Sequence, residues 1–321
     1  RPTRLLTRRI FKPRSVGYAM LDRLMGYGDR DKGPDTALLT TLFLILMLFF
    51  ISESGSLEAS QTQEQVATSS ILPDAALGTF RVACSILVVI TLSWIALDPK
   101  GSGDHPLYLK ERKLLPRKVV GPTRLAAFTM WHFALIGVSF GVSGAATWIH
   151  ASGGTVPEWM LVSSPILFST SYACAILVTC TISFHIIGDN IAKGYRVSHL
   201  FTWYEILMHN GNVALLGISL LVNEMEVEFY FLAFPAVFGI AYVAWAAIYA
   251  NFISGVFIYD FIDYRMRGAP VIYLALMSLL ISFFFVVMAL DRIAEWNTVL
   301  AAVIISAMTW RISTIKKPGQ G

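Results

Sequence analysis

Long apolar runs recur from one end of this 321-residue chain to the other, and they constrain the fold more than any other feature. A helix of about 20 apolar residues crosses a bilayer. Only 14% of the residues are charged, whereas a soluble domain carries about a quarter. The sequence therefore predicts an all-α, polytopic membrane helix bundle. We expect eight transmembrane helices, at 36–52, 75–97, 125–149, 159–187, 200–222, 229–259, 268–290 and 294–310.

Two of these segments, and one loop, carry additional signals. The run 229–259 is too long for one straight helix, and Pro235, Asn251 and Gly255 indicate a bend or a second short segment. Loop 98–124 is the only internal loop long enough to hold an amphipathic surface helix. In the third run, "GVSFGVSG" places glycines at spacings that are typical of closely packed membrane helices, at Gly137, Gly141 and Gly144.

The positive charges lie on alternate loops. The segments 1–35, 98–124, 188–199, 260–267 and 311–321 together hold 23 of the 25 Lys and Arg residues. Biased placement of Lys and Arg sets the orientation of membrane helices. Both termini are therefore expected on the positive side. The domain organisation that follows is a basic N-terminal arm (1–35), a transmembrane domain (36–310) and a basic C-terminal tail (311–321).

The N-terminal arm also predicts a location. Its opening, "RPTRLLTRRIFKPRS", is rich in Arg, begins without Met and precedes the first acidic residue, Asp22. Such a segment resembles the tail of an organellar targeting sequence, or a basic arm on an anionic membrane face. We expect an organellar inner membrane, the mitochondrial one being favoured, with the positive side facing the matrix or stroma. Cys84, Cys174 and Cys180 lie in apolar segments and are expected to be buried small hydrophobes.

The fifth run carries an unusual polar stripe in the stretch "WYEILMHNGN". At 100° per residue, Glu205, His209 and Asn212 share one helix face about 100° wide. A polar face of this kind cannot be exposed to lipid, where each unsatisfied polar group costs several kcal/mol. The stripe must face the bundle interior or a water-filled cavity.

Helix orientation places further polar residues at a similar depth, near the positive side. Seven groups from four predicted helices share this layer: Thr129, His132, His185, Glu205, His209, Asp260 and Asp263. Helix packing explains such groups without any chemistry. Glu205 and His209 would bond each other within one helix at i, i+4, and Thr129, Asn212 and Ser219 would bond across helices. Hydrolysis by Thr129 with a nearby histidine as base is an alternative. A metal or haem held by His132, His185 and His209, and a proton path through Glu205, are weaker alternatives. We expect neither a cofactor nor a metal.

Three stretches together resemble one family of membrane proteins. They are "FTMWHFALIGVSFG" (128–141), "MHNGNVALLGISLLVNE" (208–224) and "PAVFGIAYVAWAAIYANFISGVFIYDFIDY" (235–264). They resemble the androgen-inducible family of membrane lipid hydrolases and the related Rolling stone-like proteins, over roughly 125–290.

The hydrolase branch of that family implies a threonine nucleophile, a histidine, and cleavage of esters between fatty acids and hydroxy fatty acids. Thr129 matches the threonine. The catalytic histidine of that branch is the second of its motif, and Asn212 stands at this position, three residues after His209. An amide cannot accept the threonine proton, so the sequence departs from the family mechanism at its base. The Asn form resembles the Rolling stone side, for which no catalysis is implied.

The sequence thus predicts a non-catalytic, membrane-embedded structural or accessory subunit, for example of an organellar energy-transducing complex. Its expected partners are membrane lipids, bound in a polar-mouthed cavity, and other membrane subunits, contacted through apolar helix faces and the basic arm. Nucleic acid is not expected as a partner. His132, His185, Asn212, Asp260 and Asp263 would form the lipid or partner site. The alternative is an intramembrane threonine hydrolase of fatty-acid esters, with Thr129 as nucleophile, His209 as base and Glu205 orienting the imidazole.

Overall fold

A computed structural model describes residues 24–28, 30–104, 106–111, 113–192 and 194–315. In this part of the chain, seven helical segments are long and apolar enough to cross a membrane. They are α2 (Gly33–Ser54), α4 (Asp74–Leu97), α5 (Phe128–Ala151), α6 with α7 (Glu158–Ala192), α8 with α9 (Trp203–Val222), the segment of α10 (Phe229–Ser254) and α11 (Ala269–Trp296). An eighth apolar helix, α12 (Thr298–Ile312), is shorter. The prediction of an all-α, multi-pass membrane protein is confirmed.

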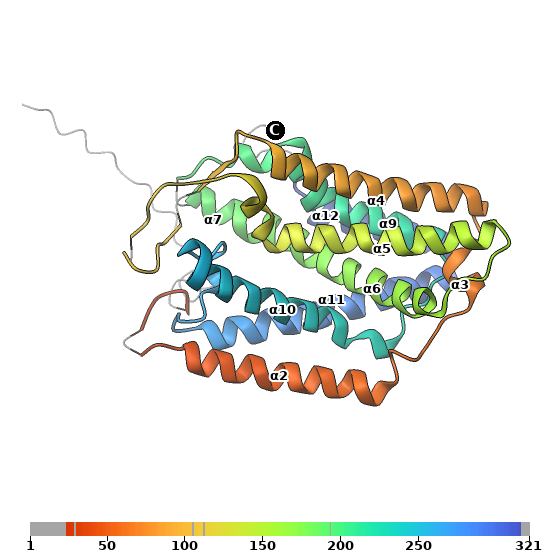
Figure 1. The fold of residues 1–321 in the computed structure, drawn as a ribbon, viewed down its shortest axis with the longest axis horizontal. Helices are drawn as coiled ribbons and strands as arrows, with labels where there is room; N and C mark the ends of the chain where they lie inside the picture. Colours follow the sequence, from red (N-terminus) through yellow and green to blue (C-terminus); the bar gives the residue numbers. More distant parts are fainter. Residues whose placement is uncertain (1–23, 29, 105, 112, 193, 316–321) are drawn as a thin grey trace, which may run out of the picture.

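Successive membrane-spanning helices run in opposite directions in one bundle (Figure 1). Helix α6 (Glu158–Thr181) lies at its centre, between α5 and α11, and almost all of its residues from Ser164 to Thr179 are buried. Helix α4 packs along α5, and α2 packs against α10 (Ala233–Ile248) and α11 at the periphery. Helix α12 lies against α9 (Asn212–Val222) and α11. The core is therefore built around α6, which separates the two sides of the bundle.

The glycines of α5 allow α4 to approach closely, as the "GVSFGVSG" pattern predicts. A Cβ atom on Gly137 would lie 2.8 Å from Val88 Cγ1, and one on Gly144 would lie 3.1 Å from the Cβ of Arg81. Larger residues at these positions would force the two helices apart. This contact is the most extensive between any two helices of the described structure.

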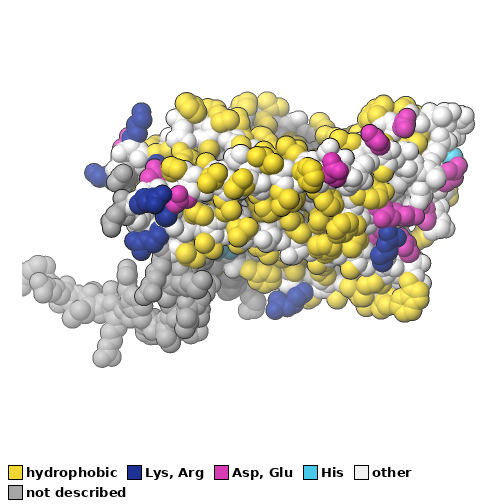
Figure 2. Space-filling model, turned by 90° about the horizontal axis from the view of Figure 1, so that it is seen from below, with side chains coloured by type: hydrophobic (Ala, Val, Ile, Leu, Met, Phe, Trp, Pro, Cys, Tyr) yellow, Lys and Arg dark blue, Asp and Glu magenta, His cyan; other side chains and the backbone are white. Residues whose placement is uncertain are grey.

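Charged side chains separate to the two ends of the bundle. The basic end comprises the described parts of segments 24–32, 98–127, 193–202 and 255–268, and the acidic end comprises segments 55–73, 152–157 and 223–228. In Figure 2, Lys and Arg side chains gather at one end of the face that is shown, and mostly Asp and Glu occupy the other. The expected N-terminal arm and C-terminal tail lie largely outside the described residues.

The loop 98–127, which is long enough for a surface helix, has a different structure in its described residues. It contains a short antiparallel hairpin, β1 (Ser102–Asp104) with β2 (Arg117–Val119), and a 3₁₀ turn at Gly121–Ala126. Tyr108 of this loop forms an isolated bridge with Val256, so the loop contacts the segment that follows α10. The short helix α3 (Gln63–Ala67) lies at the acidic end and carries a capping box at Thr62.

The sixth span ends earlier than predicted. It is one helical segment from Phe229 to Ser254, and Gly255 terminates it with a left-handed backbone, φ +73°. Its last turns, Tyr249–Ser254, form a π-helix, as do Ile182–Ile186 between α6 and α7 (Ile187–Ala192) and Leu207–Gly211 between α8 (Trp203–Ile206) and α9. All three π-helical segments lie towards the basic end. Residues 255–268 are therefore a loop, containing one 3₁₀ turn at Asp260–Ile262.

Candidate functional site

Thr129 lies in the first turn of α5, where the chain enters the bundle from the basic end. The helix begins at Phe128, after Ala127 in an extended conformation. The first backbone N–H groups of a helix have no intrahelical acceptor, and they make its N-terminus electropositive. The Thr129 side chain is buried, with 7% of its surface exposed. Its hydroxyl is thus held in a sheltered position beside a helix N-terminus.

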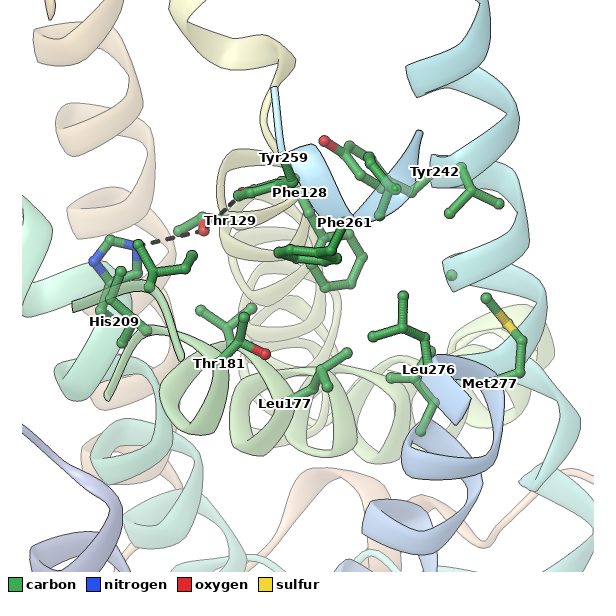
Figure 3. Close-up of a pocket in the computed structure, with 17 residues that line it drawn as sticks. Phe128, Thr129, Leu177, Thr181, His209, Tyr242, Tyr259, Phe261, Leu276 and Met277 are labelled. Atoms are coloured by element: carbon green, nitrogen blue, oxygen red, sulfur yellow. Dashed lines mark hydrogen bonds between the residues drawn. The ribbon is translucent and has the colours of Figure 1, made fainter. Parts of the chain in front are cut away.

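His209 reaches Thr129 from another helix. It lies in the π-helical segment Leu207–Gly211, and its Nε2 is 3.4 Å from Thr129 Oγ1 (Figure 3). On the other side of the ring, Nδ1 lies 3.3 Å from Oε2 of Glu205. Residues that are 80 positions apart in the sequence therefore form a continuous row: carboxylate, imidazole, hydroxyl.

This row has the order that nucleophilic catalysis requires. A threonine hydroxyl is a weak nucleophile unless an adjacent base takes its proton. A carboxylate on the far nitrogen of the imidazole holds the ring in the tautomer whose other nitrogen is free to accept. His209 Nδ1 lies within ion-pair distance of Glu205 and has no hydrogen-bond partner in the described structure. In the tautomer that carries the ring proton on Nδ1, Nε2 is the acceptor for the Thr129 hydroxyl. Catalytic hydrogen bonds without substrate are often long, and 3.4 Å agrees with that.

An apolar pocket begins at Thr129 and His209. It encloses about 600 Å³ of space free of atoms, its mouth included, between α5, α6, α10, α11 and the loop after α10. Leu177, Leu276 and Met277 are among its apolar walls, and Figure 3 shows Met277 at the end of the pocket away from His209. A lining of this apolar character suits hydrocarbon groups rather than charged ones. The row of polar groups thus opens onto a space that suits a hydrocarbon chain.

Asn212 and His132 are buried nearby but have other partners. Asn212 Oδ1 accepts from the Thr179 hydroxyl at 3.1 Å and from its neighbour's backbone N–H, Val213, at 2.7 Å. His132 Nε2 bonds the carbonyl oxygen of Ser171 at 3.2 Å. Both residues connect their helices to α6. Neither lines the pocket at Thr129.

The remaining predicted residues lie in or beside the basic end. The ring of His185 packs edge-on against Phe261 at 5.4 Å. Asp263 forms an ion pair with Arg265 and accepts a hydrogen bond from Tyr27 at 2.6 Å. Asp260 begins the 3₁₀ turn Asp260–Ile262 and is exposed. Among the described residues, no three His, Cys, Asp or Glu side chains gather in a way that could hold a metal.

Two residues in or beside the candidate site have no sequence pattern that marks them. The hydroxyl of Tyr259, in the loop after α10, lies 3.4 Å from Thr129 Oγ1. Arg124, counted only as a loop charge, is buried; it donates to the Ile95 carbonyl oxygen at 2.6 Å and contacts Tyr204, the residue before Glu205. The acidic residues of "FIYDFIDY" (257–264), Asp260 and Asp263, place this loop near the predicted polar layer. Tyr259, in the same stretch, belongs to no periodic pattern of polar residues that would mark it as part of a site.

The fold and the site define an all-α, multi-pass integral membrane protein with a Glu–His–Thr row beside an apolar intramembrane pocket. No protein-family model, curated protein or solved structure matches this chain.

Proposed function

We propose that the protein is an intramembrane hydrolase of fatty acyl esters, with Thr129 as its nucleophile. The observation that carries the proposal is the position of the Thr129 hydroxyl, 3.4 Å from Nε2 of His209, at the end of an apolar pocket. A hydroxyl that only stabilises helix packing needs neither a base nor a carboxylate behind that base, nor an apolar pocket beside it.

The position of Asn212 removes the main argument against catalysis. The expectation of a non-catalytic protein rested on an amide in place of the family's second histidine. Asn212 bonds Thr179 on α6, whereas His209, three residues earlier, contacts Thr129. The base in this proposal is therefore His209, and Asn212 serves helix packing.

The reaction proceeds in two balanced halves. Thr129 Oγ attacks the ester carbonyl carbon while its proton passes to Nε2 of His209, and the carbonyl oxygen becomes an oxyanion. The tetrahedral intermediate collapses, the bond to the alcohol oxygen breaks, and His209 returns the proton to that oxygen. Water then attacks the acyl-threonine with His209 as base, and the fatty acid leaves as Thr129 regains its proton.

The apolar walls support an acyl chain as the substrate part that enters the pocket. Leu177, Leu276 and Met277 offer hydrocarbon contacts and no charge. Esters of fatty acids with hydroxy fatty acids, implied by the family resemblance, combine such a chain with a scissile ester. Lipid substrates would reach this site from the membrane.

Two further expectations stay predictions. The organellar, specifically mitochondrial, inner membrane is supported by the Arg-rich segment 1–35, most of which lies outside the described residues. Membership of a larger membrane complex, as an accessory subunit, would be visible as comigration on a native gel in mild detergent. Neither prediction conflicts with hydrolysis.

The test is hydrolysis of a fluorogenic long-chain acyl ester by the protein reconstituted in lipid nanodiscs. Thr129→Ala and His209→Ala should each lower turnover by at least about a hundredfold, because each removes one half of the nucleophile–base pair. Thr79→Ala is the matched control, since Thr79 is an exposed threonine of α4 outside the pocket and its replacement should retain the activity. Folded wild-type protein without turnover, or Thr129→Ala with full turnover, would overturn the proposal.

A further inference from the structure

The Thr129 hydroxyl has a second partner whose role the nucleophile–base pair does not explain. The Tyr259 hydroxyl lies 3.4 Å from Thr129 Oγ1. Figure 3 shows the two contacts of Thr129 leading in different directions. One leads to His209, in the π-helical segment before α9, and the other to Tyr259, in the loop after α10. Two separate chain segments therefore converge on one hydroxyl oxygen.

The direction of the hydrogen bonds follows from the number of protons available. Thr129 has one hydroxyl proton, and that proton points to Nε2 of His209 when the imidazole acts as acceptor. The Tyr259 hydroxyl must then be the donor in its contact with Thr129, and the threonine oxygen the acceptor. Burial raises the pKa of Tyr259 above its ordinary value, which keeps this hydroxyl protonated at neutral pH.

We propose that Tyr259 is a catalytic residue, whose hydroxyl donates a hydrogen bond to the oxyanion that forms when Thr129 attacks an ester. This inference rests on the proposed function. In the tetrahedral intermediate the oxyanion and the threonine oxygen are bonded to the same carbon. A donor that already contacts Oγ1 needs only a small shift to reach the oxyanion. Donors fixed in advance at the developing charge are among the largest sources of catalytic rate enhancement.

The loop holds the tyrosine ring in place before any substrate arrives. The ring stacks on Phe261, with centroids 5.4 Å apart and planes at 26°, and meets Tyr242 edge-on at 6.4 Å. The Tyr259 backbone carbonyl oxygen accepts from Ile262 N at 3.1 Å, inside the 3₁₀ turn. An oriented donor of this kind loses little free energy in reorganisation during the reaction.

The electrostatics of α5 support an anion at the same place. Thr129 is in the first turn of this 24-residue helix, and helix N-termini stabilise negative charge through their free N–H groups and dipole. Tyr259 and the start of α5 thus face the same developing charge. A comparison outside the pocket is Tyr172 of α6, whose buried hydroxyl has no hydrogen-bond partner in the described structure.

The experiment compares Tyr259→Phe with Tyr172→Phe in nanodiscs, on the same fluorogenic ester. At Tyr259, phenylalanine keeps the ring and its packing on Phe261 and removes only the hydroxyl. Tyr259→Phe should lower kcat about a hundredfold and change KM less than threefold, as for other single oxyanion donors. Tyr172→Phe, which removes a buried hydroxyl outside the pocket, should keep kcat within twofold. The Tyr259→Phe variant should also bind an acyl trifluoromethyl ketone, which forms a tetrahedral adduct, more weakly by a similar factor, yet bind the product fatty acid unchanged.

The outcomes separate this inference from the proposed function. If the wild type is active, Thr129→Ala is inactive and Tyr259→Phe keeps more than half of its kcat, the hydrolase stands and the role of Tyr259 is wrong. A loss of kcat accompanied by an equal loss of fatty-acid binding would also overturn it, because the hydroxyl would then serve ground-state binding. If the folded wild type has no activity, both fail together.

Discussion

Glu205 and His209 lie four residues apart and meet through Oε2 and Nδ1 at 3.3 Å. The carboxylate belongs to the short helix α8 and the imidazole to the π-helical segment that follows. A packing role would need no more than this pair. The other nitrogen of the same ring, Nε2, faces Thr129, so the carboxylate and the hydroxyl lie on opposite sides of the imidazole.

Glu205→Gln should therefore lower turnover of the acyl ester by about a hundredfold, with the fold intact. Glutamine keeps the size of the side chain, but its amide cannot stabilise the imidazolium that forms in the transition state. The measurement is kcat in nanodiscs, beside the thermal unfolding of both proteins. Glu158→Gln, an exposed position at the acidic end, is the control and should leave kcat unchanged. Full activity of Glu205→Gln would remove the carboxylate from the site.

Asn212 variants test whether this amide serves packing or chemistry. Asn212→Ala leaves the Thr179 hydroxyl and the Val213 N–H without their acceptor, which costs about 1–3 kcal/mol of unfolding free energy. Activity per folded molecule should stay within about threefold. The double variant His209→Asn/Asn212→His, which moves the histidine to the family position, should be inactive. Recovery of activity in the double variant would instead place the base at position 212.

A substitution of Gly239 tests whether the acyl chain of the substrate binds in the apolar pocket. A Cβ atom at this position would lie 2.6 Å from Leu280 Cδ1, so Gly239→Ala pushes the leucine side chain towards the pocket that both residues line. The ratio of kcat/KM for a long-chain over an acetyl ester should fall about tenfold, because the longer chain needs the lost space. Gly103→Ala, in the hairpin, is the control. An unchanged ratio would show that acyl chains bind elsewhere.

A substitution of Arg81 tests how much the contacts between α3, α4 and α5 contribute to stability. Arg81 is fully buried and joins these three helices. Its Nη1 donates to the carbonyl oxygen of Val66 at 2.7 Å and to the Thr147 hydroxyl at 2.7 Å, linking α3, α4 and α5. Arg81→Met leaves these acceptors unsatisfied and should destabilise the protein by about 2 kcal/mol, measured by thermal unfolding in detergent. Proteolysis should become faster in segment 55–73. The exposed Arg292→Met should change stability by less than about 1 kcal/mol. Equal effects of both substitutions would contradict this account.

The helices could be predicted because lipid imposes one simple requirement on composition. Runs of apolar residues and alternating loop charges were sufficient to place the spans. The errors concern the ends of the helices, which local backbone geometry determines. Gly255, with its positive φ, ends the sixth span five residues before the expected end, and so turns Tyr259 into a loop residue. Residues Gly121–Ala126 form a 3₁₀ helix and Ala127 is extended, so α5 starts at Phe128 rather than at 125.

The site was only partly accessible to such reasoning. The expected depth in the membrane and the helical period pointed to three residues of the candidate site, Thr129, Glu205 and His209. Depth in the membrane does not say which helices are neighbours. Asn212 stands at the motif position where the hydrolase branch of the similar family has its catalytic histidine, and this suggested that the base is missing. In the structure, the Asn212 side chain bonds Thr179 instead. Tyr259 could not be found, since a residue in an irregular loop has no period from which its direction follows.

The π-helical segment Leu207–Gly211 has a consequence for how such a site can arise or vanish. A π turn holds one residue more than an α turn, and each added residue rotates the following side chains by about 100°. Deletion of one codon after His209 within this segment would keep the spacing of Glu205 and His209 and turn α9 by about 100° relative to α8. The smallest possible change in gene length would therefore alter which face α9 buries, the face of Asn212 included, without altering the carboxylate–imidazole pair.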